Sequence, residues 1–279
     1  MSERLARARA FLLDMDGTFF LGERLIEGAL DFIALLRQQG KPFLFLTNNS
    51  SKDREQYVEK ITRLGLPITL TQVLTSGEAA ARLLSRNHPG AKLFVVGTPS
   101  LEGEFRAAGF TLDDPRPEVV VVGFDTGLTY AKLWQLCDLV RAGRPYIVTH
   151  PDFNCPTPGG FMPDIGATIA YVKASTGREP DQVVGKPSRL MAEAAAQKLG
   201  LPLASLAMVG DRLYTDIALG QAADIPAVLV LSGETRLADL SGSPFQPDDI
   251  FEHLGALAAW LAAHATAAQT APVEAQATR

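Results

Sequence analysis

Short runs of consecutive aliphatic residues recur along the chain, and most of them are followed by a segment with helical periodicity. The runs do not alternate with polar residues, which is typical of strands buried on both faces of a parallel sheet. Between the first two runs, residues 28–40 repeat their apolar positions at helical spacing, and Gly40 suits the end of that helix. The pattern predicts an α/β protein built on parallel sheets. The runs occupy residues 10–14, 42–50, 72–84, 92–100, 118–127, 145–154, 205–216 and 226–235.

The runs between residues 92 and 154 form a group of their own in the middle of the chain. This group lies between two sets of runs that carry acidic and hydroxyl motifs. We therefore expect a discontinuous core α/β domain, residues 1–79 and 184–262, that is interrupted by a smaller inserted α/β domain at 80–183.

The C-terminal segment changes character after Phe251. Its first part predicts a terminal helix that packs Leu257, Trp260 and Leu261, and we expect Trp134 and Trp260 to belong to hydrophobic cores. The end of the chain is rich in Ala, Thr and Gln without an apolar period, so we expect residues 263–279 to form a disordered tail.

Composition excludes several classes of protein. The 279 residues carry a formal net charge of −5, which provides no basic field for a polyphosphate backbone, so nucleic acid is not an expected partner. The only two cysteines, Cys137 and Cys155, form neither a disulfide framework nor a zinc spacing, and we expect small buried or half-buried side chains. The N-terminal apolar run is too short for a signal peptide, and no stretch approaches a membrane span. These features predict a soluble cytoplasmic protein.

The first strand ends in Asp14-Met15-Asp16-Gly17, which has two interpretations. Asp-Gly between hydrophobic residues is a strong hairpin signal, so a turn is the simpler interpretation of this motif alone. An EF-hand loop is excluded, because its closing glutamate would fall on Leu25. We expect the hairpin turn a few residues later, at Gly22-Glu23, within a small flap over residues 18–26.

Polar side chains follow the other predicted strands of the core as well. In open α/β sheets, ligands bind outside the carboxyl ends of the strands, so these side chains should converge on one edge. Taken singly, each has a structural interpretation as a turn residue, a solvated charge or a helix N-terminal acid. Their joint occurrence favours a functional site. The residues are Asp14 and Asp16, then Thr47, Asn48 and Asn49, then Lys186, and finally Asp211 and Asp216.

Four carboxylates in one cavity need compensation, because like charges at short range raise each other's pKa. A divalent cation together with Lys186 would supply it. The oxygen-only set of ligands, without histidine or cysteine, predicts Mg²⁺ rather than zinc.

Four motifs, in this order, carry a resemblance to a known family: "DMDGT" at 14–18, "LTNNS" at 46–50, "GKP" at 185–187 and "GDRLYTDI" at 210–217. Together they resemble the motifs of haloacid dehalogenase (HAD) superfamily phosphatases. The segment 149–187 is similar to the cap of the NagD-like branch, which includes nucleotide, sugar, glycerol, pyridoxal and nitrophenyl phosphate phosphatases. The resemblance covers residues 10 to about 235. It implies a Rossmann-like parallel-sheet core with an inserted C2-type α/β cap.

The resemblance also implies roles for the motif residues. Asp14 would be the nucleophile that forms an aspartyl-phosphate, and Asp16 would be the acid and base. Thr47 and the amides near Asn48 and Asn49 would hold the phosphoryl oxygens, and Lys186 would neutralise their charge. The implied Mg²⁺ ligands are Asp14, Asp16 through its backbone carbonyl, and Asp211, with Asp216 in or near this set.

The loop "THPDFN" at 149–154 ends a strand of the inserted domain, where His150 is either structural or a substrate contact. We expect a Mg²⁺-dependent hydrolase of small phosphomonoesters, acting as a monomer or a homodimer. Two alternatives remain open: a phosphotransferase or mutase acting on sugar phosphates, and a non-catalytic protein that binds a phosphorylated metabolite. The sequence does not name the substrate.

Overall fold

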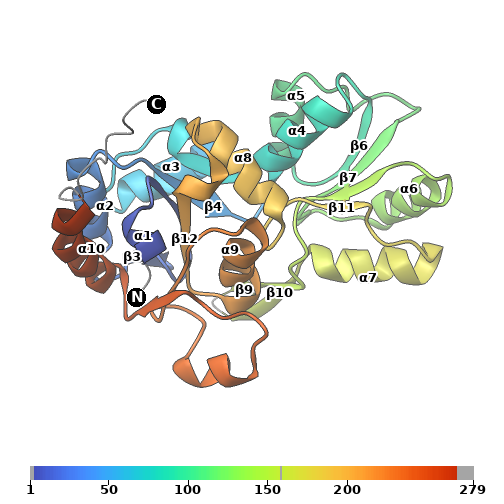
Figure 1. Ribbon diagram of the computed structural model, residues 1–279. Helices are drawn as coiled ribbons and strands as arrows, with labels where there is room; N and C mark the ends of the chain where they lie inside the picture. Colours follow the sequence, from blue (N-terminus) through green and yellow to red (C-terminus); the bar gives the residue numbers. More distant parts are fainter. Residues whose placement is uncertain (1–2, 158, 269–279) are drawn as a thin grey trace, which may run out of the picture. The chain divides into compact units, whose positions relative to one another are not determined.

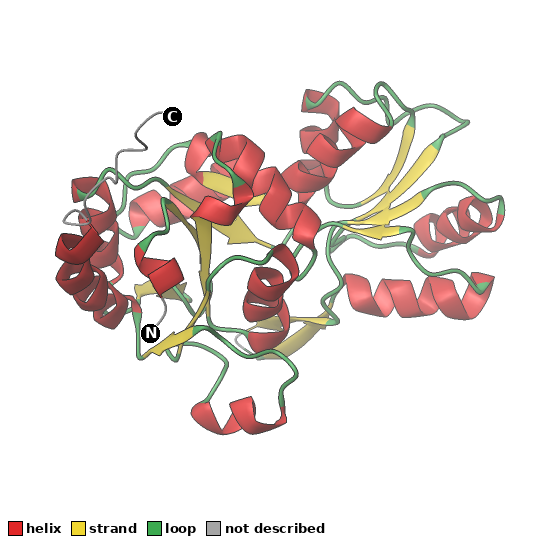
Figure 2. Cartoon of the chain, viewed as in Figure 1, coloured by secondary structure: helices red, strands yellow, loops and turns green. Residues whose placement is uncertain are grey.

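The computed structural model describes residues 3–157 and 159–268 of the chain (Figure 1). By their contacts these residues form two compact units, residues 3–43 with 204–268, and residues 44–157 with 159–203. Within the described residues, no helix combines the length and the apolar character that crossing a membrane requires. Helices and parallel strands alternate along both units, which confirms the expected α/β class (Figure 2).

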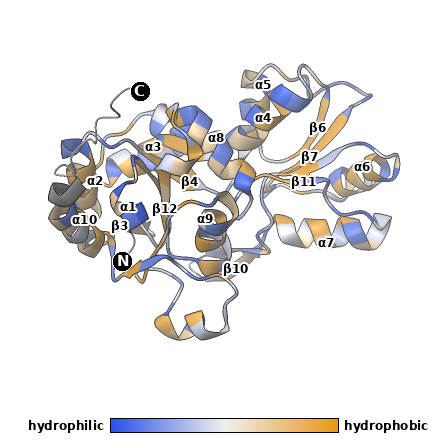
Figure 3. Cartoon of the chain, viewed as in Figure 1, coloured by the Kyte–Doolittle hydropathy of each residue, from blue (hydrophilic) through white to orange (hydrophobic). Residues whose placement is uncertain are grey.

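The first unit contains four parallel strands, which lie in the order β14-β13-β12-β1. Every residue of β1 and of β12 is buried, as their continuous apolar sequences predict. Figure 3 shows these strands as mainly hydrophobic, whereas the helices carry hydrophobic and hydrophilic residues together. The strands are β1 (Ala10–Asp14), β12 (Leu206–Gly210), β13 (Ala227–Val230) and β14 (Asp249–Phe251).

A small hairpin follows β1. Its strands, β2 (Phe20–Leu21) and β3 (Arg24–Leu25), pair antiparallel, and Gly22 between them has a positive φ of 60°. The predicted turn at Gly22-Glu23 is confirmed.

Helices α2 and α10 pack against each other in the first unit. Their close approach depends on glycine, because a Cβ atom on Gly28 would lie 2.1 Å from the Cα of Gly255. Leu257 and Leu261 of α10 are buried as expected, and Trp260 is half-buried and stacks on His264. The helices of this unit are α1 (Glu3–Ala6), α2 (Ala29–Gln38), α9 (Ala218–Ala223) and α10 (Leu254–Ala268), with short turns at Leu203–Ser205 and Leu237–Gly242.

The expected disordered tail began at residue 263, but α10 continues to Ala268. Residues 269–279, which make up the rest of that tail, lie outside the described residues.

The second unit contains a parallel four-stranded sheet in the order β11-β8-β7-β6. Helices α6 and α7 pack side by side on it and bury Leu136, Val140 and Val172 against the strands (Figure 1). A separate antiparallel hairpin, β9 with β10, precedes α7. The elements are β6 (Leu93–Val96), β7 (Val119–Val122), α6 (Tyr130–Arg141), β8 (Tyr146–Val148), β9 (Asn154–Thr157), β10 (Gly160–Pro163), α7 (Ile165–Thr176) and β11 (Gln182–Val183).

The rest of the second unit surrounds a parallel pair of strands, β4 with β5. Helix α4 packs against α8 and α5. The four-stranded sheet lies within the predicted cap, but the predicted limits 79/80 and 183/184 fall inside this unit and stay a prediction. The elements are β4 (Phe43–Thr47), α3 (Arg54–Arg63), a turn at Leu70–Gln72, β5 (Val73–Thr75), α4 (Ser76–Asn87), α5 (Pro99–Ala107) and α8 (Arg189–Leu199).

One core assignment from the sequence is wrong. Trp134 is 65% exposed, because α6 turns the face that carries Leu136, Cys137 and Val140 toward the sheet and leaves Trp134 on the outside. The cysteines are as expected, since Cys137 is buried and Cys155 is half-buried.

Candidate active site

Three of the predicted carboxylates meet in the first unit. Asp14 ends β1, and Asp211 directly follows β12, the parallel neighbour of β1. Because the carboxyl ends of adjacent parallel strands lie at the same edge, these two side chains come together. One oxygen each from Asp14, Asp211 and Asp216 lies within 4.8 Å of the others, and all three side chains are buried. The structure therefore confirms that these three residues converge.

Asp216 reaches the cluster through a π-helical turn, Leu213–Ile217. The N–H of Ile217 donates to the carbonyl oxygen of Arg212 at 3.2 Å, and the N–H of Arg212 donates to the Asp216 carboxylate at 3.1 Å. A Cβ atom on Gly210 would lie 2.2 Å from the Asp216 Cγ, so only glycine fits at the end of β12. π-Helical turns occur often at functional sites, and this one was not predictable from the residue pattern.

The Asp211 carboxylate sits in a close-fitting cradle. Thr18 Oγ1 donates to its Oδ1 at 3.2 Å, and the N–H of Glu234 donates to its Oδ2 at 2.7 Å. A Cβ atom on Gly17 or on Gly233 would lie 2.4 or 2.0 Å from that same Oδ2. The cradle holds Asp211 in one orientation.

The loop after β13 completes this cradle. Ser232 Oγ donates to the carbonyl oxygen of Gly17 at 2.8 Å. The Glu234 carboxylate is paired with the Arg212 guanidinium at 2.9 Å and accepts from the Tyr214 hydroxyl at 2.8 Å. Sequence reasoning assigned no role to the segment 232–235. This segment follows the buried strand β13, just as Asp14 ends β1 and Asp211 follows β12. That position in the sequence was the signal that could have identified it.

Burial and charge repulsion together perturb the acidic cluster. Burial, and then the negative charges of Asp14 and Asp216, raise the pKa of Asp211 to about 8. A divalent cation would remove this repulsion, and a set of carboxylate oxygens is what hard cations prefer. The residues therefore fit a divalent cation, which Asp14 and Asp211 would hold, with Asp216 beside them.

Asp16 differs from its neighbours in the motif. It is exposed, and its backbone forms an isolated bridge with Phe20. The N–H of Gly17 donates to the Phe20 carbonyl oxygen at 2.8 Å, and Gly17 has a positive φ of 85°. The backbone therefore bends sharply just after Asp16, as the glycine predicts. The expected proton-transfer role of Asp16 stays a prediction.

A second group of predicted residues meets within the second unit, around Asn48. The Asn48 side chain accepts from the Lys186 N–H at 2.8 Å and donates to the Lys186 carbonyl oxygen at 2.9 Å. Its amide nitrogen also lies 3.2 Å from the Asp152 carboxylate. Protein atoms therefore use the whole side-chain amide, which fixes the backbone of the buried Lys186.

Gly185 makes this arrangement possible. A Cβ atom at this position would lie 2.6 Å from the carbonyl oxygen of Thr149 and 2.7 Å from Asn48 Oδ1. The N–H of Gly185 donates to the same Thr149 carbonyl at 2.7 Å. The glycine of the "GKP" motif thus allows the Lys186 segment to approach two neighbouring segments closely.

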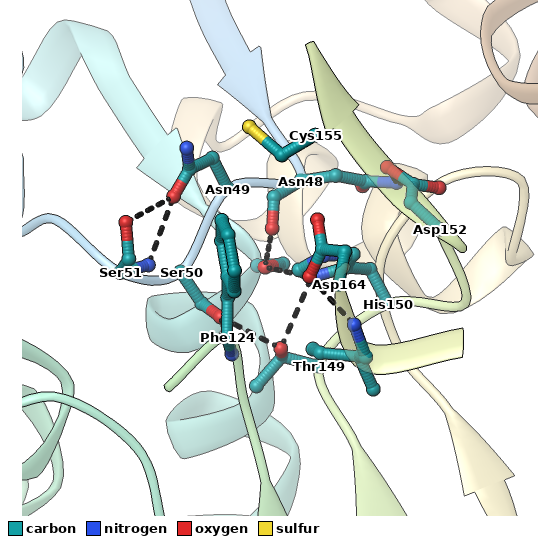
Figure 4. A network of polar contacts seen from close by, with 12 residues as sticks. Asn48, Asn49, Ser50, Ser51, Phe124, Thr149, His150, Asp152, Cys155 and Asp164 are labelled. Atoms are coloured by element: carbon teal, nitrogen blue, oxygen red, sulfur yellow. Dashed lines mark hydrogen bonds and ion pairs between the residues drawn. The ribbon is translucent and has the colours of Figure 1, made fainter. Parts of the chain in front are cut away.

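Thr47 and Asn49 shape the turn after β4. Thr47 is buried at the carboxyl end of the strand, and its hydroxyl accepts from the Asn49 N–H at 3.2 Å. The Asn49 side-chain oxygen, Oδ1, accepts from the N–H of Ser51 at 2.9 Å (Figure 4). Ser50 Oγ lies 2.9 Å from Thr149 Oγ1, which ties this turn to the segment that carries His150.

His150 is fully buried, and both ring nitrogens face protein atoms (Figure 4). One nitrogen lies 3.2 Å from Thr149 Oγ1, and the other lies 3.1 Å from the Asp164 carboxylate. Asp164 in turn accepts from the N–H of Ile165 at the start of α7. The hydrogen-bonding capacity of His150 is used within the protein, and its expected contact with substrate stays a prediction.

Replacing Asn48 with alanine should lower the free energy of unfolding by about 2–6 kcal/mol, because each of two buried backbone groups of Lys186 would lose its partner at about 1–3 kcal/mol. Asn49→Ala is the matched control, since the Asn49 side chain bonds only within its own turn among the contacts described. Urea unfolding of both variants measures the difference. Equal losses in the two variants would show that Asn48 does not hold the Lys186 segment.

Known proteins are similar to this chain in both sequence and fold. A haloacid dehalogenase-like hydrolase family model matches residues 11–111, and a HAD-hydrolase-like model matches residues 183–257. An acid sugar phosphatase from Staphylococcus saprophyticus is 36% identical over 247 residues, which cover 88% of this chain and 95% of that protein.

Two solved structures extend the comparison. A 4-nitrophenylphosphatase from Thermotoga maritima superimposes with a TM-score of 0.89 at 44% identity, covering 92% of this chain and 99% of that one. NagD from E. coli K-12 has a TM-score of 0.83 at 31% identity, covering 89% and 97%. These similarities confirm the expected fold class. The chain belongs to the haloacid dehalogenase-like hydrolases and is a phosphatase of their NagD-like branch.

Proposed function

We propose that this enzyme is a Mg²⁺-dependent phosphatase that hydrolyses small phosphomonoesters through an aspartyl-phosphate on Asp14. The observation that carries the proposal is the buried cluster of Asp14, Asp211 and Asp216 at the carboxyl ends of parallel strands. The relatives named as acid sugar phosphatase and 4-nitrophenylphosphatase favour sugar phosphates and p-nitrophenyl phosphate as substrates.

In the proposed reaction, an Asp14 carboxylate oxygen attacks the substrate phosphorus while the bond from phosphorus to the leaving alkoxide breaks. Asp16 gives its proton to that alkoxide. It then removes a proton from the water that attacks the aspartyl-phosphate, which releases phosphate and restores Asp14. The exposed position of Asp16 suits a residue that exchanges protons with water.

The remaining residues bind and neutralise charge. Thr47 and the backbone N–H of Asn48 hold the phosphoryl oxygens, because the Asn48 side chain is occupied by Lys186. The Lys186 ammonium neutralises developing negative charge, and Asn49 supports the turn. Bound Mg²⁺, held by Asp14, Asp211 and the Asp16 carbonyl with Asp216 nearby, would supply further neutralisation at the phosphoryl group.

Two further parts of the proposal concern selectivity. Residues 80–183 act as the cap that excludes water and selects the leaving group. His150 acts on the substrate only through the loop residues that it holds, since its side chain is fully buried.

We place the enzyme in the cytoplasm, with a small phosphorylated metabolite as its partner.

The direct test is hydrolysis of p-nitrophenyl phosphate and a panel of sugar phosphates, scored as inorganic phosphate released. Activity should require Mg²⁺, disappear with EDTA and return when excess Mg²⁺ is added. Full activity in EDTA would contradict the metal requirement. Transfer of the phosphoryl group to a sugar hydroxyl without release of phosphate would instead identify a phosphotransferase or mutase, and ligand binding without turnover would identify a non-catalytic binding protein.

A further inference from the structure

A cavity of about 440 Å³ in the second unit is lined by none of the residues assigned to catalysis. One face of α4 supplies one wall, with Glu78, Arg82 and Arg86 at helical spacing. Arg54 at the start of α3 and Glu104 of α5 line it from neighbouring elements. The cavity therefore gathers charged side chains from three helices.

Three arginines, Arg54, Arg82 and Arg86, and two glutamates, Glu78 and Glu104, line this cavity. The Glu78 carboxylate forms ion pairs with Arg82 at 2.8 Å, Lys198 at 2.6 Å and Arg54 at 3.5 Å. Two of these cations, Arg54 and Arg82, belong to the lining, and a third arginine of the lining, Arg86, contacts the Gln197 side chain. Guanidinium groups present several donors in a planar fork, which matches the oxygens of a phosphate or carboxylate.

Arg54 lies only partly in contact with the cavity, since its side chain is 29% exposed. Its Nε atom is buried and has no hydrogen-bond partner among the described residues. A buried donor without an acceptor is costly, and such groups are rare in folded proteins. This nitrogen is closed to a ligand in the cavity, so an oxyanion would contact Arg54 through the exposed part of its guanidinium group, beside the Nη1 atom that lies 3.5 Å from Glu78.

Glu104 introduces an acceptor into this cavity. The Thr75 hydroxyl donates to the Glu104 carboxylate at 3.1 Å. Burial raises the pKa of Glu104 to about 7, with the charge of Glu78 adding to the effect and the Thr75 hydrogen bond and Arg54 opposing it. A carboxylate among arginines repels a fully ionised anion, but it accepts a hydrogen bond from an anion that still carries a proton.

We propose that this cavity is a binding site for a protonated phosphate group, with Arg54, Arg82 and Arg86 binding its oxygens and Glu104 accepting its P–OH. Sulfate carries no such proton near neutral pH, so the site discriminates against it. Inorganic phosphate, which is the product of a phosphatase, keeps a P–OH at neutral pH, whereas the phosphoryl group of a metabolite has a second pKa of about 6 and has mostly lost that proton. Inorganic phosphate is therefore the expected ligand. The cavity is large enough to hold either.

The site is adjacent to residues that hold the Lys186 segment. Thr75, which contacts Glu104, caps α4 by accepting from the Glu78 N–H at 2.9 Å. The next residue, Ser76, donates its hydroxyl to the carbonyl oxygen of Asn48. A ligand in the cavity would therefore contact the helix whose first turn supports Asn48.

Isothermal titration of the full-length, metal-free enzyme with inorganic phosphate and with methyl phosphate tests the proposal. The wild-type protein should bind one more equivalent of the titrated anion than Arg54→Gln does, because any binding at the catalytic residues is common to both proteins. Arg141→Gln, an exposed arginine on α6 outside the cavity, should bind as wild type does. If circular dichroism shows that Arg54→Gln does not fold, Arg86→Gln takes its place and should weaken the extra equivalent at least tenfold.

The choice of anion adds a second criterion. At pH 7, sulfate should bind to the cavity at least tenfold more weakly than phosphate. In Glu104→Gln, the difference between the phosphate affinity and the sulfate affinity should be smaller. If wild type binds the extra equivalent only of inorganic phosphate, free phosphate is the ligand. If it also binds an extra equivalent of methyl phosphate, the ligand is the phosphoryl group of a metabolite. Equal stoichiometry and affinity in wild type and the arginine variant, or sulfate binding as tightly as phosphate, would overturn the proposal. Neither result would bear on catalysis at Asp14.

Discussion

Asp14→Asn should reduce kcat for p-nitrophenyl phosphate by about 10⁴-fold or more, which is the order of loss seen when a catalytic nucleophile is removed. The amide has the same shape as the carboxylate but lacks the anionic oxygen that attacks phosphorus. The substitution also removes a negative charge that helps to raise the pKa of Asp211, so the variant should fold at least as well as wild type without metal.

The measurement is steady-state kinetics at saturating Mg²⁺, with circular dichroism to establish folding. Asp31→Asn is the matched control, because Asp31 is an exposed residue in the first turn of α2. It should retain wild-type kcat. Wild-type activity in a folded Asp14→Asn protein would exclude Asp14 as the nucleophile.

Gly17→Ala should reduce Mg²⁺ affinity about 10–100-fold, as expected when the support of a metal ligand is disturbed. The new Cβ atom would lie 2.4 Å from the Asp211 carboxylate oxygen, so this side chain must leave its cradle. The positive φ of 85° adds a backbone penalty of about 1–2 kcal/mol for any residue with a Cβ atom. Activity should fall together with Mg²⁺ affinity, because the Asp211 carboxylate would no longer lie beside the Asp14 carboxylate.

Gly22→Ala separates these two effects. Gly22 also has a positive φ, of 60°, but a Cβ atom there would meet nothing within 4 Å. This variant should lose stability by a similar backbone penalty and keep wild-type Mg²⁺ affinity. Isothermal titration calorimetry measures the Mg²⁺ affinity of each variant, and urea unfolding measures its free energy of unfolding. Identical Mg²⁺ affinity in both would show that the Asp211 cradle has no influence on the metal.

Much of this protein is determined by its sequence alone. Apolar runs without alternation predict parallel buried strands, because periodicity and burial are local properties of a chain. The polar residues that end those runs predict a site, since parallel strands present their carboxyl ends together. Asp14 and Asp211 illustrate this, and the hairpin at Gly22-Glu23 follows from local turn chemistry.

Other features depend on contacts between segments that lie far apart in the sequence. Thr18 and Glu234 were not recognised, because their role exists only through hydrogen bonds to Asp211. Asn48 matched a phosphate-binding motif, yet its side chain holds the backbone of Lys186, which lies 138 residues later. Trp134 was assigned to a core because tryptophan is usually buried, but the orientation of α6 places it outside.

The sequence by itself therefore determined the α/β class, the family and the carboxylates of the candidate site. Only the tertiary structure decided which side chains orient Asp211 and Lys186, and where a cluster of arginines surrounds a cavity. The physical reason is the range of the interactions. Strand and turn preferences act between near neighbours, whereas cradles, clamps and cavities arise only where distant segments pack together and their unpaired groups must find partners.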